Sequence, residues 1–279
     1  MIEIKNLSFK YREGTAPVVH DINLTIPDGQ FVGITGAAGS GKSSLTYVLN
    51  GIVPHCYPGD FYGSVVVDGH DTCDTSLTDI SLMVGSVCQD IESQMVSSVV
   101  EDEILYGLEN FSVPRQEIEA RVAEALDVMG ISDLRDRSIA GLSGGQKQKV
   151  AIAAILALKP RVLVLDEPTA ELDPASSVNV FSLLKRYASE HGTTVVVVEQ
   201  KIALLSDFAD RLLIVDGGTI RFDGTPEQVL EHSDELLSIG VNCPRSTSLS
   251  NVLRARGLYG GGVCKNVAQA TAMVKEVLA

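Results

Sequence analysis

The chain has 279 residues, 45% of them hydrophobic, which suffices for the core of one large domain or of one domain with a small appendage. Its formal net charge of −14 repels a phosphate backbone overall, so we expect no nucleic-acid partner. We find neither a secretory signal pattern nor an apolar run of bilayer length, so we expect a soluble protein or one held at a membrane by partners.

The first third of the chain predicts β-strands separated by turn-rich segments. The first two are IEIKNLSF (2–9) and VVHDINLTI (18–26), and SVVVDG (64–69) predicts a later one. Between them, FVGIT (31–35) runs directly into the glycine-rich GAAGSGKSS, after which a short helix is expected.

The middle of the chain predicts helices. One covers 114–130, with Pro114 near its first turn and Gly130 at its end. A second follows Gly141 and stops before Pro160. This helix-rich stretch, about 90–158, interrupts the strands and therefore predicts an inserted helical lobe.

Apolar strands return after the lobe, at RVLVLDEP (161–168), VVVV (195–198) and RLLIVDGG (211–218), with a helix predicted over 174–192. Such alternation of buried strands with helices predicts a largely parallel sheet covered on both faces. With the turn-rich start, this makes an α/β fold with a mixed central sheet and an N-terminal antiparallel part.

The composition shifts past about residue 233, where proline, serine and glycine mix before a final predicted helix. We therefore expect a main domain at 1–232 and a small C-terminal appendage at 233–279. The five cysteines are scattered without a Cys-x-x-Cys pair, which fits a reducing cytosol and gives no metal signal.

The segment GAAGSGKS (36–43) matches the pattern G-x-x-x-x-G-K-[ST] of a phosphate-binding loop. Its glycines let backbone N–H groups turn toward phosphate oxygens without a clash at Cβ. Lys42 supplies charge for the β- and γ-phosphates, and the Ser43 hydroxyl is a Mg²⁺ ligand. The helix that follows directs its positive end at the same anion. The pattern predicts an ATP-type site rather than an ordinary glycine-rich turn.

Two acids end the strand RVLVLDEP. Such a strand places Asp166 near the metal and Glu167 one residue farther, toward the γ-phosphate. Asp166 can then hold Mg²⁺ through its water shell while Glu167 orients the attacking water. Acids also occur at solvated strand ends, so it is the phosphate loop that favours the catalytic interpretation.

The segment LSGGQKQ (142–148) indicates which class of phosphate-loop protein the chain resembles. Together with the phosphate loop and the acidic strand end, it resembles the signature of ABC transporter ATPases, which other phosphate-loop families do not carry. Ser143 and the two glycines after it, at a helix N-terminus, would form a second anion cradle. The resemblance implies that this cradle caps the γ-phosphate of an opposite subunit, in a head-to-tail dimer around two ATP molecules.

The resemblance covers roughly residues 2–232 and implies a set of site residues. Those implied to bind ATP are Tyr11, stacked on adenine, and Gly36, Ala37, Ala38, Gly39, Ser40, Gly41, Lys42, Ser43 and Ser44. Those implied to cap the partner's ATP are Leu142, Ser143, Gly144, Gly145 and Gln146. The implied metal ligands are Ser43, Gln89 and Asp166, and Asp173 in ELDP (171–174) would face the partner's site. A lone tyrosine can also be a core or surface ring, so it is the family pattern that favours Tyr11 as the adenine contact.

A narrower resemblance rests on NGIVPHCYPGDFYGSVVVDGHDT, CQDIESQ, VEDEILYGLEN and VNCPRSTSLSNVLRARG, which look like ATPase subunits of energy-coupling-factor (ECF) importers. It implies uptake of a vitamin or a transition-metal ion, with the ATPase at the cytoplasmic face of the cell membrane. The implied partners are an integral membrane coupling subunit, docking near Gln89 and Gln94, and a substrate-binding membrane subunit. That last subunit sets specificity in the family, so the substrate is not written in this chain.

The stretch VVVVEQK (195–201) departs from the family pattern. Gln200 stands where most members carry a histidine that contacts the γ-phosphate and helps hold the attacking water. The chain's histidines are elsewhere, at His20, His55, His70, His191 and His232. ATP binding should survive this change, but fast hydrolysis is in doubt. We therefore favour a heterodimer, with Glu167 and Gln200 as this chain's catalytic pair.

Two other functions stay open. A soluble ABC ATPase acting on DNA or the ribosome would need long coiled-coil arms or a second ATPase unit, and we find neither pattern in the sequence. A non-hydrolysing nucleotide-binding regulator fits Gln200, although Lys42 and Glu167 argue against it.

Overall fold

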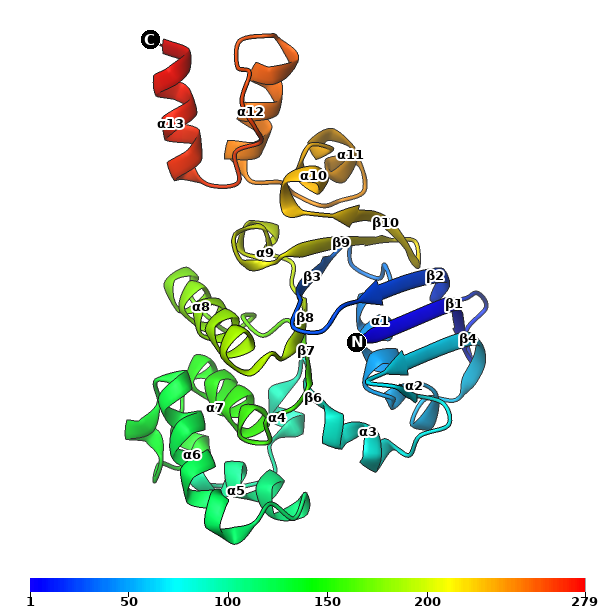
Figure 1. Cartoon of the computed structure of the whole chain (residues 1–279), viewed down its shortest axis with the longest axis vertical. Helices are drawn as coiled ribbons and strands as arrows, with labels where there is room; N and C mark the ends of the chain where they lie inside the picture. Colours follow the sequence, from blue (N-terminus) through cyan, green and yellow to red (C-terminus); the bar gives the residue numbers. More distant parts are fainter. Residues whose placement is uncertain (279) are drawn as a thin grey trace.

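Ten strands form two sheets in the computed structural model, which describes residues 1–278 (Figure 1). Residue 279, the last of the predicted appendage, lies outside the described residues. The strands are β1 (Ile2–Tyr11), β2 (Val19–Ile26), β3 (Phe31–Thr35), β4 (Gly59–Val67), β5 (His70–Asp71), β6 (Val84–Val87), β7 (Val162–Asp166), β8 (Thr194–Val198), β9 (Arg211–Asp216) and β10 (Thr219–Gly224).

The two sheets differ in direction. The first has the order β2-β1-β4-β5 and is antiparallel throughout. The second has the order β10-β9-β3-β8-β7-β6, and only its edge pair β9–β10 is antiparallel. The structure therefore confirms a mixed central sheet beside an N-terminal antiparallel part.

The helices surround the central sheet and extend beyond it. They are α1 (Lys42–Leu49), α2 (Ile52–His55), α3 (Leu77–Met83), α4 (Ile91–Gln94), α5 (Val100–Asn110), α6 (Arg115–Met129), α7 (Gly144–Ala157), α8 (Pro174–His191), α9 (Ile202–Phe208), α10 (Pro226–Leu230), α11 (Ser233–Ser238), α12 (Arg245–Ala255) and α13 (Val267–Leu278). Of these, α4 to α7 lie in the segment predicted to form the helical lobe. None of the helices within residues 1–278 is both long and apolar enough to cross a bilayer.

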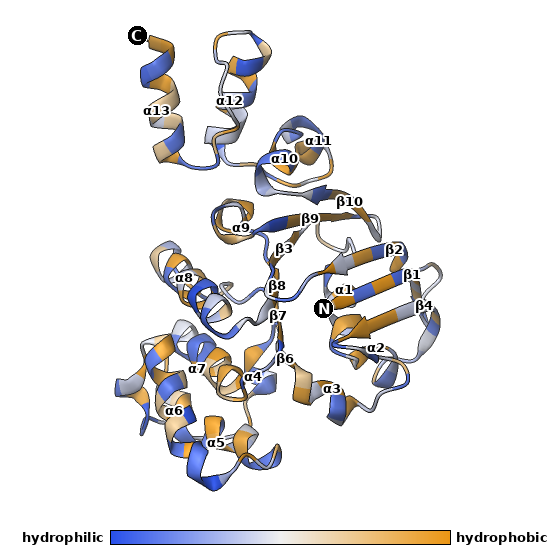
Figure 2. Cartoon of the chain, in the orientation of Figure 1, coloured by the Kyte–Doolittle hydropathy of each residue, from blue (hydrophilic) through white to orange (hydrophobic). Residues whose placement is uncertain are grey.

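Alternate residues of each central strand enter two separate cores, because successive side chains in a strand point to opposite faces. In β8, Val195 and Val197 face the core shared with the lobe and α8. Val196 and Val198 face the core shared with α1 and the antiparallel sheet. Figure 2 shows the hydrophobic residues that result along the central strands. A strand buried on both faces needs an unbroken apolar run, which explains the four valines.

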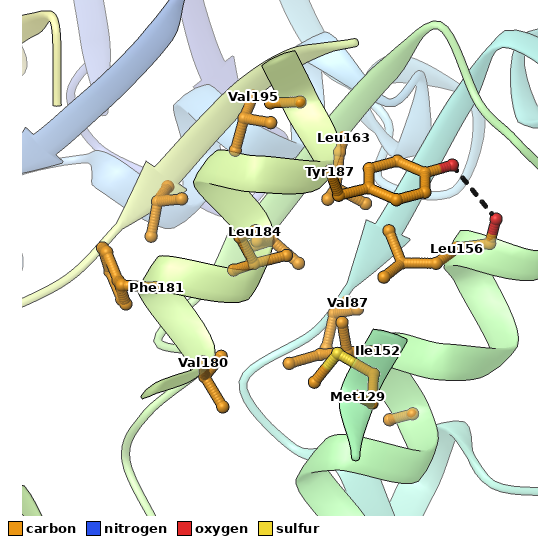
Figure 3. Close-up of a cluster of buried hydrophobic side chains, with 14 of the residues drawn as sticks. Val87, Met129, Ile152, Leu156, Leu163, Val180, Phe181, Leu184, Tyr187 and Val195 are labelled. Carbon is orange, nitrogen blue, oxygen red and sulfur yellow. Dashed lines mark hydrogen bonds between the residues drawn. The ribbon is translucent and has the colours of Figure 1, made fainter. Parts of the chain in front are cut away.

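The lobe is joined to the sheet by packed apolar side chains (Figure 3). Met129 of α6 and Ile152 of α7 lie beside Val87 of β6, and all three are fully buried. Tyr187 of α8 donates a hydrogen bond from its buried hydroxyl to the carbonyl oxygen of Leu156, at 3.2 Å. Burial raises the pKa of Tyr187 to about 12, because the charged phenolate would lose its solvation there.

Some elements differ from the prediction. The strand predicted over 64–69 begins earlier, at Gly59, where its exposed residues break the apolar pattern. The structure adds β6, whose sequence VGSV lacks an apolar run, and β10, whose residues are half-exposed. It also adds α12, which the sequence did not indicate because serine, asparagine and arginine interrupt its apolar period. In Figure 1, α12 and α13 project away from the sheets.

Candidate functional site

The phosphate loop, residues 36–43, connects β3 to α1, and its glycines are required by the backbone. Gly41 has a φ of 103°, and a Cβ there would lie 2.6 Å from the carbonyl oxygen of Val18. A Cβ on Gly36 would lie 2.0 Å from the carbonyl oxygen of Val215. Residues 39–44 and Val18 line a cavity of about 270 Å³. The loop therefore folds as a tight cradle over the N-terminus of α1.

Lys42 already lies across this cradle. Its Nζ donates hydrogen bonds to the carbonyl oxygens of Gly36, at 3.0 Å, and Ala37, at 2.7 Å. Burial lowers the pKa of Lys42, whereas the nearby carboxylates of Glu167 and Asp166 raise it. The ammonium is thus preplaced in the loop, where an anionic ligand would stabilise its charge further.

Asp166, the last residue of β7, lies beside Ser43. Burial raises its pKa, while a hydrogen bond from the Ser43 hydroxyl lowers it. A carboxylate and a hydroxyl at one point offer the oxygen ligands that Mg²⁺ prefers, with the remaining ligands left to phosphate and water. Two of the three predicted metal ligands therefore lie together and fit the ion. The third, Gln89, contacts Glu167 instead.

Glu167 lies between two amides. Its Oε1 accepts a hydrogen bond from Nε2 of Gln200 at 2.7 Å, and its Oε2 accepts one from Nε2 of Gln89 at 3.2 Å. Its φ of 52° is unusual for a residue other than glycine and is typical of strained functional positions. The structure brings these three predicted residues together, but the Gln200 amide contacts the Glu167 carboxylate rather than pointing freely toward the phosphate loop.

The imidazole expected in this family is not supplied from another part of the chain. All five histidines lie within the described residues and contact other groups: His20 the carbonyl of Gly217, His55 that of Thr72, His70 that of Asp68, His191 that of Tyr187, and His232 the carboxylate of Glu235. Gln200 therefore faces Glu167 without a substitute histidine beside it.

An aromatic cluster borders the phosphate loop. The Tyr11 hydroxyl lies 3.1 Å from Oγ of Ser44, and its ring meets Tyr57 edge-on at 5.9 Å. Tyr57 in turn stacks on Tyr47 at 5.7 Å. An adenine beside Tyr11 would therefore meet more than one aromatic ring. The sequence analysis missed Tyr47 and Tyr57, because no spacing marks them.

The signature residues lie at a helix N-terminus, as the pattern predicted. Ser143 caps α7, and a capping box joins it to Gln146. Ser143, Gln146, Gly144, Gly145 and residues 171–173 line a cavity of about 400 Å³. Leu142 instead packs partly buried against the lobe core. Asp173 also lines the cavity and caps α8.

The signature cavity and the phosphate-loop cavity have no lining residue in common within residues 1–278. By the resemblance that the sequence shows, each would supply one half of the phosphate contacts to a sandwiched ATP, so a single chain would hold two separate half-sites.

A third cavity, apolar and about 260 Å³, lies between α3, β6 and the lobe. Its lining residues include Leu77, Ser81, Phe111 and Leu158. Gln94, expected at a docking surface, is turned inward: its Oε1 accepts from the N–H of Cys88 and its Nε2 donates to the carbonyl of Ser86. Gln94 thus stabilises the loop before α4. The apolar cavity lies beside this loop, since Ser86 is one of its lining residues.

The chain resembles known proteins along most of its length. The family model described as "ABC transporter" matches residues 19–170. A putative ABC transporter ATP-binding protein of Pyrococcus abyssi is 40% identical over 258 residues, covering 92% of each chain. The energy-coupling factor transporter ATP-binding protein EcfA1 of Caldanaerobacter subterraneus is 41% identical over 262 residues, again covering 92% of each.

Two solved structures share the fold. CbiO1 of Clostridium perfringens, described as part of the ABC transporter complex CbiONQ, has a TM-score of 0.75 and 29% identity, covering 91% of this chain and 98% of that one. The ATP-binding cassette MJ0796, a dimer in a post-hydrolysis state with ADP and Pi, has a TM-score of 0.71 and 27% identity, covering 81% and 99%.

Proposed function

The chain belongs to the ABC transporter family of ATPases, and from that membership we propose that its ATP hydrolysis drives an importer of the ECF type. The relatives named EcfA1 and the fold shared with CbiO1 support this type. In this proposal residues 1–232 form the ATPase unit, residues 233–279 form an appendage, and the chain works at the cytoplasmic face of the membrane. Its cargo is a vitamin or a transition-metal ion, bound by a separate membrane subunit.

The separation of the two half-sites carries the proposal. Because the signature cavity and the phosphate-loop cavity lie apart in one chain, a complete ATP site needs a second ATPase subunit turned head to tail. The dimeric MJ0796 structure supports such an arrangement. We favour a heterodimer, since Gln200 leaves this chain's own site without the family's histidine.

The residues around the phosphate loop then take distinct roles. Lys42 and the loop N–H groups bind the β- and γ-phosphates, and Tyr11 stacks on the adenine. Ser43 and Asp166 would hold Mg²⁺, which neutralises phosphate charge when bound. Glu167 orients the attacking water, once closure of the dimer frees its Oε2 from the amide of Gln89 while Gln200 stays on Oε1.

Glu167→Gln with Mg-ATP is expected to trap a closed dimer, with itself or with a second ATPase subunit. The amide keeps the side-chain shape but removes the carboxylate that activates water, so bound ATP persists between the subunits. Light scattering should show the mass doubling with ATP and reverting with ADP.

The matched control combines Glu167→Gln with Ser143→Arg, which fills the signature cavity and should restore the monomer. A Glu167→Gln chain that stays monomeric with every candidate partner would contradict the sandwich, and with it the proposed arrangement.

Membrane association is expected only through a hydrophobic partner. Alone, the chain should remain at the bottom of a liposome flotation gradient; with its coupling subunit in the liposomes it should float. We propose that the coupling subunit docks at the apolar cavity beside Gln94. Ser81→Arg places a charge in this cavity and should abolish flotation, because a buried unpaired charge is costly.

Thr78→Arg, one turn earlier on the exposed side of α3, is the matched control and should float normally. Flotation of the chain without any partner would point to direct lipid binding and would contradict this docking model.

A further inference from the structure

A buried polar network lies directly behind Gln200. Its buried members are Glu199, Thr169 and Ser177, each at most 2% exposed. Lys201 is an exposed residue, but its ammonium reaches the network. They come from three segments: the end of β8, the turn that follows Glu167, and the first turns of α8. The roles assigned to the site so far do not use this network.

The Glu199 carboxylate is the centre of the network. Its Oε1 accepts hydrogen bonds from the backbone N–H groups of Gln200, at 2.9 Å, and Lys201, at 3.2 Å. Its Oε2 accepts a hydrogen bond from the Thr169 hydroxyl. The backbone of Glu199 itself is bonded to the carbonyl of Ile34, next to the phosphate loop. Glu199 therefore fixes the backbone of Gln200 relative to β3 and β7.

Lys201 extends the network to α8. Its Nζ donates to the carbonyl and the hydroxyl of Thr169, at 2.8 and 3.2 Å, and to Oγ of Ser177 at 3.3 Å. Ser177 in turn donates to the carbonyl of Asp173 at 2.9 Å. One ammonium thus links the switch segment, residues 199–201, to the turn after Glu167 and to the residue that lines the signature cavity.

The charges of the network depend on one another. A buried carboxylate is stable only with hydrogen-bond donors and a nearby counter-charge. Here the Thr169 hydroxyl donates to the carboxylate of Glu199 and accepts from the ammonium of Lys201. Loss of the ammonium removes the donor that orients this hydroxyl, and with it the positive charge that is linked to Glu199 through Thr169.

We propose that Glu199 and Lys201 are positioning residues that hold Gln200 against Glu167 and tie both to Asp173. Their side chains form hydrogen bonds to Thr169, to Ser177 and to the backbone of residues 200 and 201. Asp173 lines the signature cavity, which in the proposed dimer faces the partner's ATP. The same link would therefore couple the ATP site at this chain's phosphate loop to the ATP site at the partner's phosphate loop. This last step rests on the proposed dimer, whereas the positioning role rests on ATPase activity alone.

The test is Lys201→Met, which keeps most of the side-chain length but removes the charge and the donors. We expect kcat for ATP to fall about tenfold while ATP affinity stays within about twofold, since small displacements of a catalytic group are costly. Lys201→Arg should retain most of kcat. The matched control is Lys185→Met. Lys185 lies farther along α8, and its ammonium pairs with Asp210, so this change should alter neither kcat nor ATP affinity.

A double-mutant cycle separates positioning from general stability. In a Gln200→Ala background, Lys201→Met should lower kcat by less than about twofold, because the residue it positions is already gone. If Lys201→Met lowers the unfolding temperature, Ser177→Ala replaces it in the same cycle, because it removes only the hydroxyl that accepts from Lys201 and donates to Asp173, and no charge. The positioning role would be overturned if Lys201→Met left kcat unchanged. It would also be overturned if Lys201→Met lowered kcat by the same factor with and without Gln200. A wild-type chain that is inactive with every membrane partner would instead overturn the proposed function.

Discussion

Replacing Lys42 by alanine is expected to weaken ATP binding about ten- to a hundredfold. Lys42 is the only charged residue of the phosphate loop, and its Nζ is held there by the carbonyls of Gly36 and Ala37. A charge-assisted contact to phosphate is worth roughly 1.5–3 kcal/mol, or about one to two factors of ten. Titration of a fluorescent ATP analogue into the wild-type and variant chains measures the difference.

The pH dependence of the same titration adds an independent test. Burial lowers the pKa of Lys42, so rising alkaline pH should remove its charge, and with it affinity for ATP, earlier than for an exposed lysine. The alanine variant should lack this loss. Lys149→Ala, a lysine lining the signature cavity, is the matched control and should bind normally in the monomer. Equal affinity of wild type and Lys42→Ala would mean that the loop is not the phosphate site.

The parts of the site that are contiguous in sequence could be predicted without the structure. The phosphate loop needs glycines, a lysine and a serine in one run between a strand and a helix, and the acids of β7 follow directly on an apolar strand. In both cases the chain itself holds the groups together. Local spacing therefore carries the chemical information.

The contacts across strands could not be predicted in the same way. Gln89 and Glu167 are 78 residues apart, and Glu167 and Gln200 are 33 apart. They meet because β6, β7 and β8 are neighbours, so that the ends of these parallel strands lie at one edge of the sheet. Since β6 has too few apolar residues to be recognised, its place in that order was not available from the sequence.

The buried network behind Gln200 was missed for a related reason. Glu199, like Gln200, looks like part of a polar loop after a strand, because a sequence does not reveal that a carboxylate is buried. Only the turn after β7 supplies the hydroxyl and the counter-charge contacts that let Glu199 stay inside. Expectation and structure thus diverge where a polar group depends on distant partners.

Gln200→His is expected to speed ATP hydrolysis by the isolated chain about a hundredfold to a thousandfold. An amide can donate one hydrogen bond to a phosphate oxygen and accept one from water, so ground-state binding is partly kept. It cannot gain a proton, and it offers less to the charge that develops in the transition state. Loss of one such contact typically costs about 2.7–4 kcal/mol, which corresponds to that range in rate. Steady-state phosphate release from the two chains measures it.

The position of Gln200 sharpens this expectation. Its Nε2 lies 2.7 Å from Oε1 of Glu167, so the amide holds the carboxylate in place but brings no positive charge toward the phosphate. An imidazole in the same place can both contact that carboxylate and take a positive charge near the γ-phosphate. The double variant Glu167→Gln/Gln200→His must stay inactive if the gain uses this site. If Gln200→His is no faster than wild type, the amide is an adequate equivalent. The unequal pair, with a slow site here and a faster one on a histidine-bearing partner, should then be abandoned.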